Sequence, residues 1–271
     1  MRGASRQSMS AAEDRLDGLL GQPGMSAAAV GDELFNIADL LDAQAALRSA
    51  LTDPSRDGDD KAAMVQSLLS GKVSEPVVEF VAGTVRERWS GSRDLADAVN
   101  TLAVDAVLTS AQQQGQLDGL EDELFRFSRV IAAEPTLRAA LTDRALPASR
   151  KAELVSGLLD GKVGPETIRL ASRSVTHPRG RSLEAALAVL ADRAAGRRQR
   201  LVATVTSAVL LTEGQREQLA ASLARQFGHD IHLNVVVDQE VVGGLRVSLG
   251  DEVIDGTVAT RLDEAQRRII G

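Results

Sequence analysis

The amino-acid sequence predicts a mostly helical protein, in which a duplicated helical bundle precedes a small α+β domain. Three observations lead to this fold class. The 271 residues include five Phe, one Trp and no Tyr, so the core must be built from Ala, Leu and Val, which favour closely packed helices. A helical segment occurs twice along the chain. After residue 200 the spacing of hydrophobic residues changes from the helical to the alternating period.

The repeat is visible without gaps. Residues 32–73 align with residues 122–163, and 19 of the 42 positions are identical, where chance at an ordinary composition gives roughly three or four. Two copies are too few for an open solenoid, so a duplicated bundle is the simpler interpretation. We therefore divide the chain into a first copy (residues 1–92), a second copy (residues 93–200) and a C-terminal domain (residues 201–271).

The first copy is predicted to have the same order of helices as the second copy, where the sequence signals are clearer. Its acidic loop, residues 53–60, stands where the second copy has a Pro-started turn, and its segment 74–89 is apolar enough to pack inside. Between the copies an aliphatic stripe continues over several turns, formed by Leu95, Val99, Leu102, Ala106 and Val107. This long helix can serve as the last helix of the first copy and the first helix of the second.

Five further helices are predicted in the second copy, each marked by an apolar face or by Pro near its start. The first has Leu120, Leu124, Phe127 and Ile131 on one face, and a short one begins at Pro135 and carries Leu137 and Leu141. The third helix begins at Pro147, has Leu154, Leu158 and Leu159 inward and ends at Gly161. The fourth runs from about Pro165 to before His177-Pro178. The last has Leu183, Leu187 and Leu190 on one face.

The C-terminal domain begins with residues 201–209, which are rich in Val and Thr as strands are. Thr212 and Gln215 have the spacing of a capping box, which predicts a helix up to about Phe227. Alternating apolar residues then predict strands at 231–237 and 245–249, separated by Gly243-Gly244, and Val253-Ile254 predicts a short strand before a final helix near 258–270.

Motifs that could bind nucleotides or metals are explained better by local structure. The Gly-Lys pairs at 71–72 and 161–162 lack the upstream Gly and the following Ser or Thr of a phosphate loop, so we interpret them as helix ends. His177, His229 and His232 show no metal-ligand spacing on a helix face. The chain has no Cys, which excludes a disulfide scaffold, a Cys-ligated metal and a cysteine nucleophile.

No motif assembles a catalytic site, and two interpretations of the function stay open at this point. A small hydrolase could use Asp251, Glu252 or Asp255, although turn chemistry explains acidic residues beside Gly. An unrelated helical scaffold or adaptor would need only the repeat. The Arg-rich stretch 179–200 has six Arg against two acidic residues, and it could be a solvated face or a contact for an acidic partner.

Charge and hydropathy exclude further classes of protein. The formal net charge is −7 and aromatic residues are few, so nucleic-acid binding is not expected. No run of apolar residues approaches the length of a membrane span, and the N-terminus lacks the apolar core of a signal peptide. The expected location is therefore the cytoplasm, without a direct membrane span.

The stretch from residue 234 to residue 269 closely resembles the signature of the delta subunit of F-type ATP synthases, whose mitochondrial counterpart is the oligomycin-sensitivity-conferring protein. The positions that carry the resemblance are Asp238, Gly243, Gly244, Gly250, Asp251, Val253, Ile254, Asp255, Gly256, Arg261 and Leu262, with Thr257 in place of the usual Ser. Residues 93–200 resemble the six-helix N-terminal domain of that family, and the length is similar to that of its long, Streptomyces-like actinobacterial form.

The resemblance implies a stator subunit of the peripheral stalk that performs no catalysis and needs no cofactor. It implies that the six-helix domain binds the N-terminal helices of alpha subunits and that the C-terminal domain meets the C-terminal end of the b subunit. The complex would lie at the cytoplasmic face of the plasma membrane. The implied groove is formed by the family's first and fifth helices, here by Val99, Leu102, Ala103, Ala106, Val107, Ser110, Ile168, Ala171 and Val175.

Overall fold

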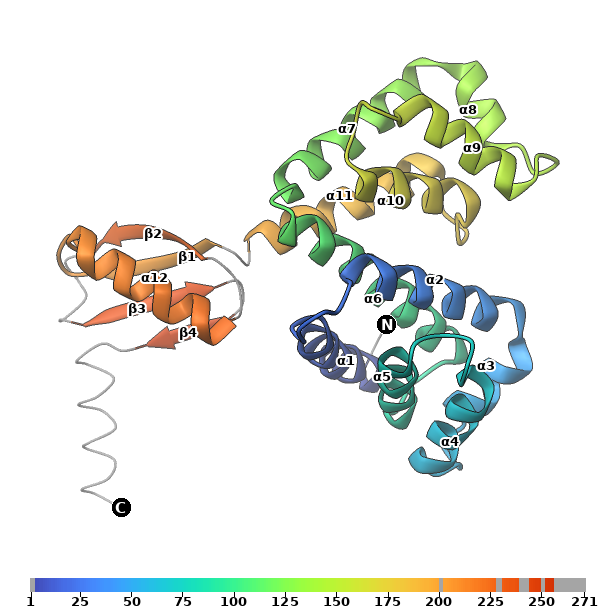
Figure 1. The fold of residues 1–271 in the computed structure, drawn as a ribbon, viewed down its shortest axis with the longest axis horizontal. Helices are drawn as coiled ribbons and strands as arrows, with labels where there is room; N and C mark the ends of the chain where they lie inside the picture. Colours follow the sequence, from blue (N-terminus) through green and yellow to red (C-terminus); the bar gives the residue numbers. More distant parts are fainter. Residues whose placement is uncertain (1–2, 200–201, 228–230, 239–243, 250–251, 256–271) are drawn as a thin grey trace. The chain divides into compact units, whose positions relative to one another are not determined.

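The structure is a computed structural model that describes residues 3–199, 202–227, 231–238, 244–249 and 252–255. The chain divides into two compact units, residues 1–191 and residues 192–271. The first unit is built from helices and the second contains a sheet (Figure 1). The predicted fold class is therefore confirmed.

The first copy forms helices α1 (Ala4–Leu20), α2 (Ala27–Ala43), α3 (Ala45–Thr52), α4 (Gly58–Leu69) and α5 (Glu75–Arg86). Ser26 caps α2 by accepting a hydrogen bond from the backbone N–H of Ala29 at 3.3 Å. Asp57 caps α4 in the same way through the N–H of Asp59 at 2.8 Å. The acidic loop is thus shorter than the sequence predicts, because its last residues start α4. Helix α5 packs inside, as its apolar sequence predicts.

The second copy forms α6 (Ser92–Gln113), α7 (Leu117–Ala133), α8 (Pro135–Thr142), α9 (Ala148–Leu159), α10 (Pro165–Thr176) and α11 (Leu183–Gln199). The predicted apolar faces of α7 and α11 are buried. Gly161 follows α9 with a φ of +67°, which confirms its role as a helix end. The predicted inward face of α9 is wrong by a small rotation, because Val155 and Leu159 are buried while Leu154 and Leu158 are half-buried.

Helix α6 belongs to the packing of both copies. It contacts α1, α2 and α3 of the first copy and α7 and α10 of the second. Its residues 102–111 are buried without a break. A helix buried on all sides lies in the interior of a larger helical body, so the predicted double role of α6 is confirmed.

Helix α2 packs along α6 through an apolar face, formed by Val30, Leu34, Ile37, Ala38 and Leu41, which are all buried. Full burial of a Val, Leu or Ile side chain stabilises a fold by about 1.5–3 kcal/mol. The contact between α2 and α6 is therefore among the main stabilising contacts of the first unit.

The second unit contains β1 (Val202–Ser207), α12 (Glu213–Phe227), β2 (His232–Val237), β3 (Leu245–Leu249) and β4 (Glu252–Asp255). The strand order is β2-β1-β3-β4, with β1 and β2 parallel and the other pairs antiparallel. The predicted capping box is present, since the N–H of Thr212 donates to Oε1 of Gln215 at 2.9 Å and the N–H of Gln215 donates back to Oγ1 of Thr212 at 3.4 Å. Helix α12 contributes Leu223 to a small core with Ala203, Val205, Ile231 and Val247.

Parts of the prediction lie outside the described residues. These are the final helix near 258–270, with Thr257, Arg261 and Leu262, and the turn residues Gly243, Gly250, Asp251 and Gly256. Among the described helices, none has the length and the apolar sequence that a membrane crossing requires.

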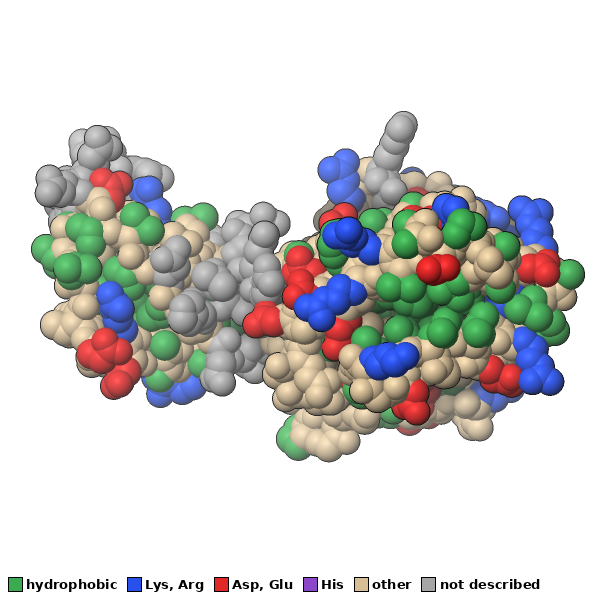
Figure 2. Space-filling view, turned by 90° about the horizontal axis from the view of Figure 1, so that it is seen from above, with side chains coloured by type: hydrophobic (Ala, Val, Ile, Leu, Met, Phe, Trp, Pro, Cys, Tyr) green, Lys and Arg blue, Asp and Glu red, His purple; other side chains and the backbone are tan. Residues whose placement is uncertain are grey.

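Hydrophobic and charged side chains are mixed over the viewed surface of the first unit, with one gathering of hydrophobic groups (Figure 2). The large hydrophobic side chains that are exposed in this unit, among the described residues, are Phe125, Val130 and Val189. Scattered exposed apolar residues are normal on a protein surface and do not by themselves mark a site.

Candidate functional site

The nine residues predicted to form a groove lie on α6 and α10, and eight of them are buried: Val99, Leu102, Ala103, Ala106, Val107, Ser110, Ala171 and Val175. Ile168 on α10 is half-buried. The two helices do contact each other, as a groove made by both requires. The structure therefore brings these residues together, but in the interior of the first unit.

Helix α2 covers the α6 side of the predicted groove. Gly31 of α2 approaches so closely that a Cβ atom on it would lie 2.8 Å from Cγ2 of Val107 and 3.2 Å from the carbonyl oxygen of Ala103. Val99 lies farther along α6, beside Val81 and Val85 of α5 and Leu41 of α2. Three of the residues assigned to an incoming helix, Val99, Ala103 and Val107, thus contact the first copy of the same chain.

A buried polar contact joins α6 to α10 at the other end of the groove. Oγ of Ser110 donates to Oε1 of Glu166 at 2.9 Å, and Nε2 of Gln114 donates to the same oxygen at 2.8 Å. Glu166 is buried at the start of α10, where the helix dipole favours a carboxylate. Ser110 therefore holds α10 against α6.

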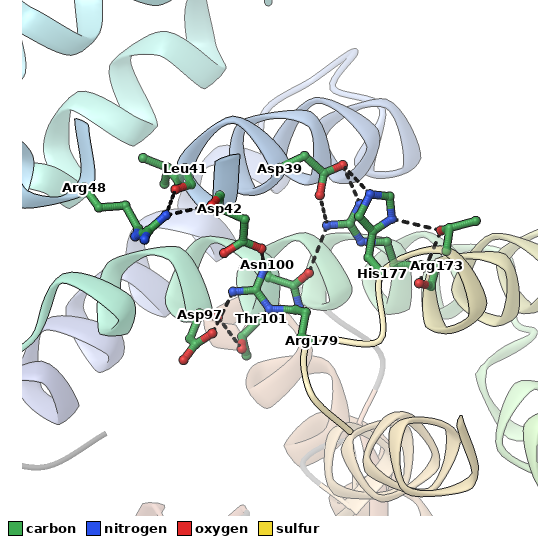
Figure 3. A network of polar contacts seen from close by, with 11 residues as sticks. Asp39, Leu41, Asp42, Arg48, Asp97, Asn100, Thr101, Arg173, His177 and Arg179 are labelled. Carbon is green, nitrogen blue, oxygen red and sulfur yellow. Dashed lines mark hydrogen bonds and ion pairs between the residues drawn. The ribbon is translucent and has the colours of Figure 1, made fainter. Parts of the chain in front are cut away.

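A row of ion pairs joins α2 to α10 and to the segment that follows it. Arg169 binds both carboxylate oxygens of Asp32, at 2.7 and 3.1 Å, and Arg173 binds both oxygens of Asp39, at 2.7 and 2.6 Å. Arg179 pairs with Asp42 and, at 2.6 Å, with Asp97 of α6. We call this set the clasp: Asp32, Asp39, Asp42, Asp97, Arg169, Arg173 and Arg179. Its inner part is drawn in Figure 3.

The centre of the clasp is Arg173. Its guanidinium lies 4.5 Å from the centre of the Phe35 ring and donates to Oδ1 of Asn100 at 3.2 Å, besides its two bonds to Asp39. The side chain is only 12% exposed. A guanidinium this enclosed needs its carboxylate partner, because an unpaired buried charge is costly.

Arg179 is held in an unusual backbone conformation. Its φ is +49°, and among the described residues other than Gly it is the one with a positive φ. That region costs free energy for a residue with a side chain, so surrounding contacts must maintain it. The two carboxylates of Asp42 and Asp97 supply such contacts to a side chain that is 13% exposed.

His177 lies beside the clasp. Its Nε2 is 3.3 Å from Oδ2 of Asp39 and its Nδ1 is 2.9 Å from Oγ1 of Thr176. Burial and the neighbouring charge of Arg173 lower the pKa of His177 below its ordinary value of 6.5, although Asp39 and Asp42 act in the opposite direction. The imidazole is therefore neutral at pH 7. Among the described residues no cluster of three potential metal ligands occurs.

The clasp was not predicted from the sequence, although most of its residues differ from their counterparts in the other copy. Shifted by 90 positions, Asp39 corresponds to Arg129, Asp42 to Ala132, Arg169 to Glu79, Arg173 to Gly83 and Gly31 to Glu121. The contact between the copies is thus made mostly at positions where the copies differ, although Asp32 matches Asp122. Asp39 and Asp42 lie inside the gapless repeat, whereas Gly31, Arg169 and Arg173 lie beyond its ends, so the repeat alone does not single these residues out.

In the second unit the described signature residues lie around the sheet. Asp238 follows β2, and its N–H donates to the carbonyl oxygen of Ser207 at 2.9 Å. Gly244 precedes β3 with a φ of +84°, which only Gly adopts easily. Ile254 is exposed on β4 and Asp255 ends that strand. The side chains of Asp251, Glu252 and Asp255, the candidate carboxylates of a hydrolase, lie outside what the structure describes.

The same unit has an open cavity of about 440 Å³ beside β1 and α12. It is lined by Ser207, Val209, Leu211, Gln215, Leu219 and Leu245, among others. Val209 of this lining and its neighbour Leu210 are 68% and 71% exposed. Two large aliphatic side chains exposed next to an apolar cavity form a surface suited to another protein.

Comparison with known proteins supplies the context for these surfaces. The family model described as ATP synthase delta (OSCP) subunit matches residues 104–269. The chain is 51% identical to the ATP synthase subunit delta of Streptomyces coelicolor over 99% of this chain and 98% of that protein. It is 50% identical to that of Streptomyces griseus over the full length of both, and 49% identical to that of Kineococcus radiotolerans over 99% and 98%.

A solved Toxoplasma gondii mitochondrial ATP synthase hexamer contains a chain that is 18% identical and covers 62% of this one, with a TM-score of 0.32. That structural likeness is too slight to argue from. The family model covers more than half of the chain, and relatives about half identical extend over nearly all of it. The chain therefore belongs to the ATP synthase delta (OSCP) subunit family.

Proposed function

We propose that this chain is a stator subunit of an F-type ATP synthase, which links the catalytic head to the b-subunit stalk and performs no chemistry itself. The observation that carries the proposal is the identity of about half of all residues with delta subunits over their whole length. The added first copy is included in that match, so it belongs to the subunit and is not a foreign domain.

The packing of the first unit suits a part that must resist torque. Small side chains let its helices approach closely, and the clasp adds paired charges across the copies. A rigid body of this kind transmits force with little deformation, because packed interiors are as dense as organic crystals. We place the subunit peripherally, at the cytoplasmic face of the plasma membrane, as part of the synthase complex.

The contact with the head is proposed at the level of the alpha N-terminal helices, and the nine groove residues stay a prediction. Their burial changes how they can be tested. Ala106→Arg or Ala171→Glu would place a charge at a fully buried position and would destabilise the bundle itself. Ile168 is the one predicted contact that an incoming helix could reach without rearrangement, so Ile168→Glu is the suitable variant.

The contact with the b subunit is proposed at the open cavity of the second unit. Val209→Asp combined with Leu210→Asp should weaken co-purification of b at least tenfold, because the charged residues would replace exposed apolar contacts. Val253→Asp is the matched control, since Val253 is also exposed and aliphatic but lies on β4.

The test of the function as a whole is co-purification. The tagged chain, co-expressed with its cognate alpha and b subunits, should retain both. If b is retained equally by the Val209/Leu210 variant, the cavity is the wrong surface. If the wild-type chain retains neither alpha nor b, the stator proposal fails.

A further inference from the structure

Linking the catalytic head to the stalk assigns no role to the first copy, and its contacts with the second copy point to one. We propose that the first copy is a permanent intrachain partner of the second: α2 covers the α6 side of the predicted groove, is tied to α10 by the clasp, and stays there when the subunit is assembled, so that an alpha helix meets the second copy only outside α2, on the side of Ile168. The proposal rests on the proposed function only for the identity of the helix that would otherwise compete for that face.

The first step is steric. Gly31 brings the backbone of α2 against Val107 and Ala103, at distances that leave no room even for a methyl group. A second helix cannot occupy the same part of α6 while α2 is present. The face is therefore either closed by α2 or opened by removing it.

The second step concerns what removal of α2 would expose. The face of α2 toward α6 contains Val30, Leu34, Ile37 and Leu41, and all are buried. Ile37 and Leu41 line a small internal cavity of the first copy together with residues of α3, α4 and α5. Because α2 cannot leave without opening the core of the first copy, a competing helix would have to replace the core of a whole bundle.

The third step is electrostatic. Displacement of α2 would separate Asp39 from Arg173 and Asp42 from Arg179, and both arginine side chains are nearly enclosed. Planar guanidinium–carboxylate pairs with two hydrogen bonds are strong and specific in orientation. The clasp therefore fixes both the position of α2 and its rotation about its own axis.

The fourth step compares the copies. Helix α7 is the counterpart of α2, but it has Glu121 in place of Gly31 and Arg129 in place of Asp39. Phe125, the counterpart of Phe35, is 59% exposed, whereas Phe35 is covered by Arg173. The fit of α2 to α6 and α10 is thus particular to the first copy and is not a general property of the repeated unit.

A disulfide lock tests the proposal in an assembled complex. The chain has no Cys, so Gly31→Cys with Val107→Cys creates a single possible intrachain pair. Replacing Val107 by Cys removes the γ-methyl group 2.8 Å from a Cβ at position 31, while the carbonyl oxygen of Ala103 at 3.2 Å remains and must shift slightly. We expect the oxidised protein to co-purify with alpha and b subunits within twofold of the reduced protein. If oxidation abolishes assembly and a reductant restores it, α2 must leave its site and the proposal is wrong.

Hydrogen exchange in the wild-type chain gives an answer that does not depend on the variant folding. The amides of α2 should exchange as slowly in the assembled subunit as in the free one, and about as slowly as those of α6. Loss of α2 protection on assembly would overturn the proposal.

The two proposals can fail separately. If the wild-type chain does not assemble with alpha and b, the stator function fails. The free chain still decides the role of α2 in that case: slow exchange of its amides supports the intrachain partner, and exchange at least a hundredfold faster than in α6 overturns it.

Discussion

At the scale of single residues, Arg173 gives the sharpest prediction. Arg173→Ala removes two bonds to Asp39, one to Asn100 and the contact with Phe35, and it leaves a half-buried carboxylate without its partner. We expect the free energy of unfolding of the first unit to fall by about 2–4 kcal/mol. Urea unfolding followed by the fluorescence of Trp89, the single Trp, measures it.

Arg126→Ala is the matched control for that substitution. Arg126 pairs with Asp122 at 3.5 Å, but the side chains are 77% and 71% exposed. Exposed pairs contribute little, so the change should be within about 0.5 kcal/mol. If the two substitutions lower the free energy of unfolding equally, the clasp contributes no more to stability than an exposed ion pair.

His177 makes the stability of the first unit depend on pH. Its folded pKa is lowered by burial and by Arg173, so the unfolded chain binds a proton more readily than the folded one. The stabilisation from neutral His177 is complete above the ordinary pKa of 6.5 and is lost as pH falls from there through the lower folded pKa. The Tm of the wild type should therefore fall more between pH 7.5 and pH 5.5 than that of His177→Gln. An identical fall in both proteins would exclude His177 as the cause.

The family resemblance assigned the groove residues to an incoming helix, but their own sequence pattern does not say what they contact. An aliphatic face that packs against another subunit and one that packs against the same chain have the same composition. Val107 and Ala103 illustrate this, because their partner Gly31 lies more than 70 positions earlier in the sequence and has no side chain to signal a contact.

At the scale of elements, the crossing of α2 over α6 depends on Gly31. Gly31→Ala should destabilise the first unit by about 1–3 kcal/mol, because an added methyl group overpacks a tight contact. The gain in helix propensity, about 1 kcal/mol, works in the opposite direction and does not offset it. Thermal unfolding followed by circular dichroism measures the change.

Gly18→Ala in α1 is the control at the same scale. A Cβ on Gly18 meets no atom within 4 Å, so only helix propensity acts and the variant should be more stable by about 0.5–1 kcal/mol. Opposite signs for the two Gly→Ala changes are the expected result. Stabilisation by both would mean that α2 can shift away from α6 at little cost.

Most elements could be predicted because their signals are local. Pro135 and Pro165 start α8 and α10, Gly161 ends α9 and the alternation at 231–237 forms β2. The rotation of α9 was not predictable to one position, because Leu154, Val155, Leu158 and Leu159 offer two apolar faces and tertiary packing selects one. The all-round burial of α6 was also hidden, since Asp105, Thr109 and Ser110 interrupt its apolar pattern.

At the scale of the whole molecule, the two copies should behave as one cooperative body. Deleting residues 1–90 exposes Val99, Ala103 and Val107 on α6 together, so we expect the remaining chain to self-associate and to lose helix beyond the deleted part. Size-exclusion chromatography and circular dichroism measure both effects. Supplying residues 1–90 as a separate polypeptide should reduce the association. A monomeric deletion variant with a cooperative thermal transition would contradict the expectation.

The sequence predicted the order of the domains along the chain better than it predicted the contacts between the two copies. The repeat and the change of period separate a helical part from an α+β part, and the resemblance near the C-terminus indicated the family. What joins the copies could not be predicted from the repeat itself, because the clasp consists largely of residues that only one copy has, such as Asp39 and Arg173.

Because α6 is common to both bundles, duplication of the helical unit added α1 to α5 without adding a linker between them. Two bundles joined by a flexible tether would act as springs in series, and the softer joint would set their combined compliance. A continuous helix through both leaves no such joint. Under the torque of a rotary motor, this part of the chain would turn as one stiff lever, and bending would be confined to its attachments.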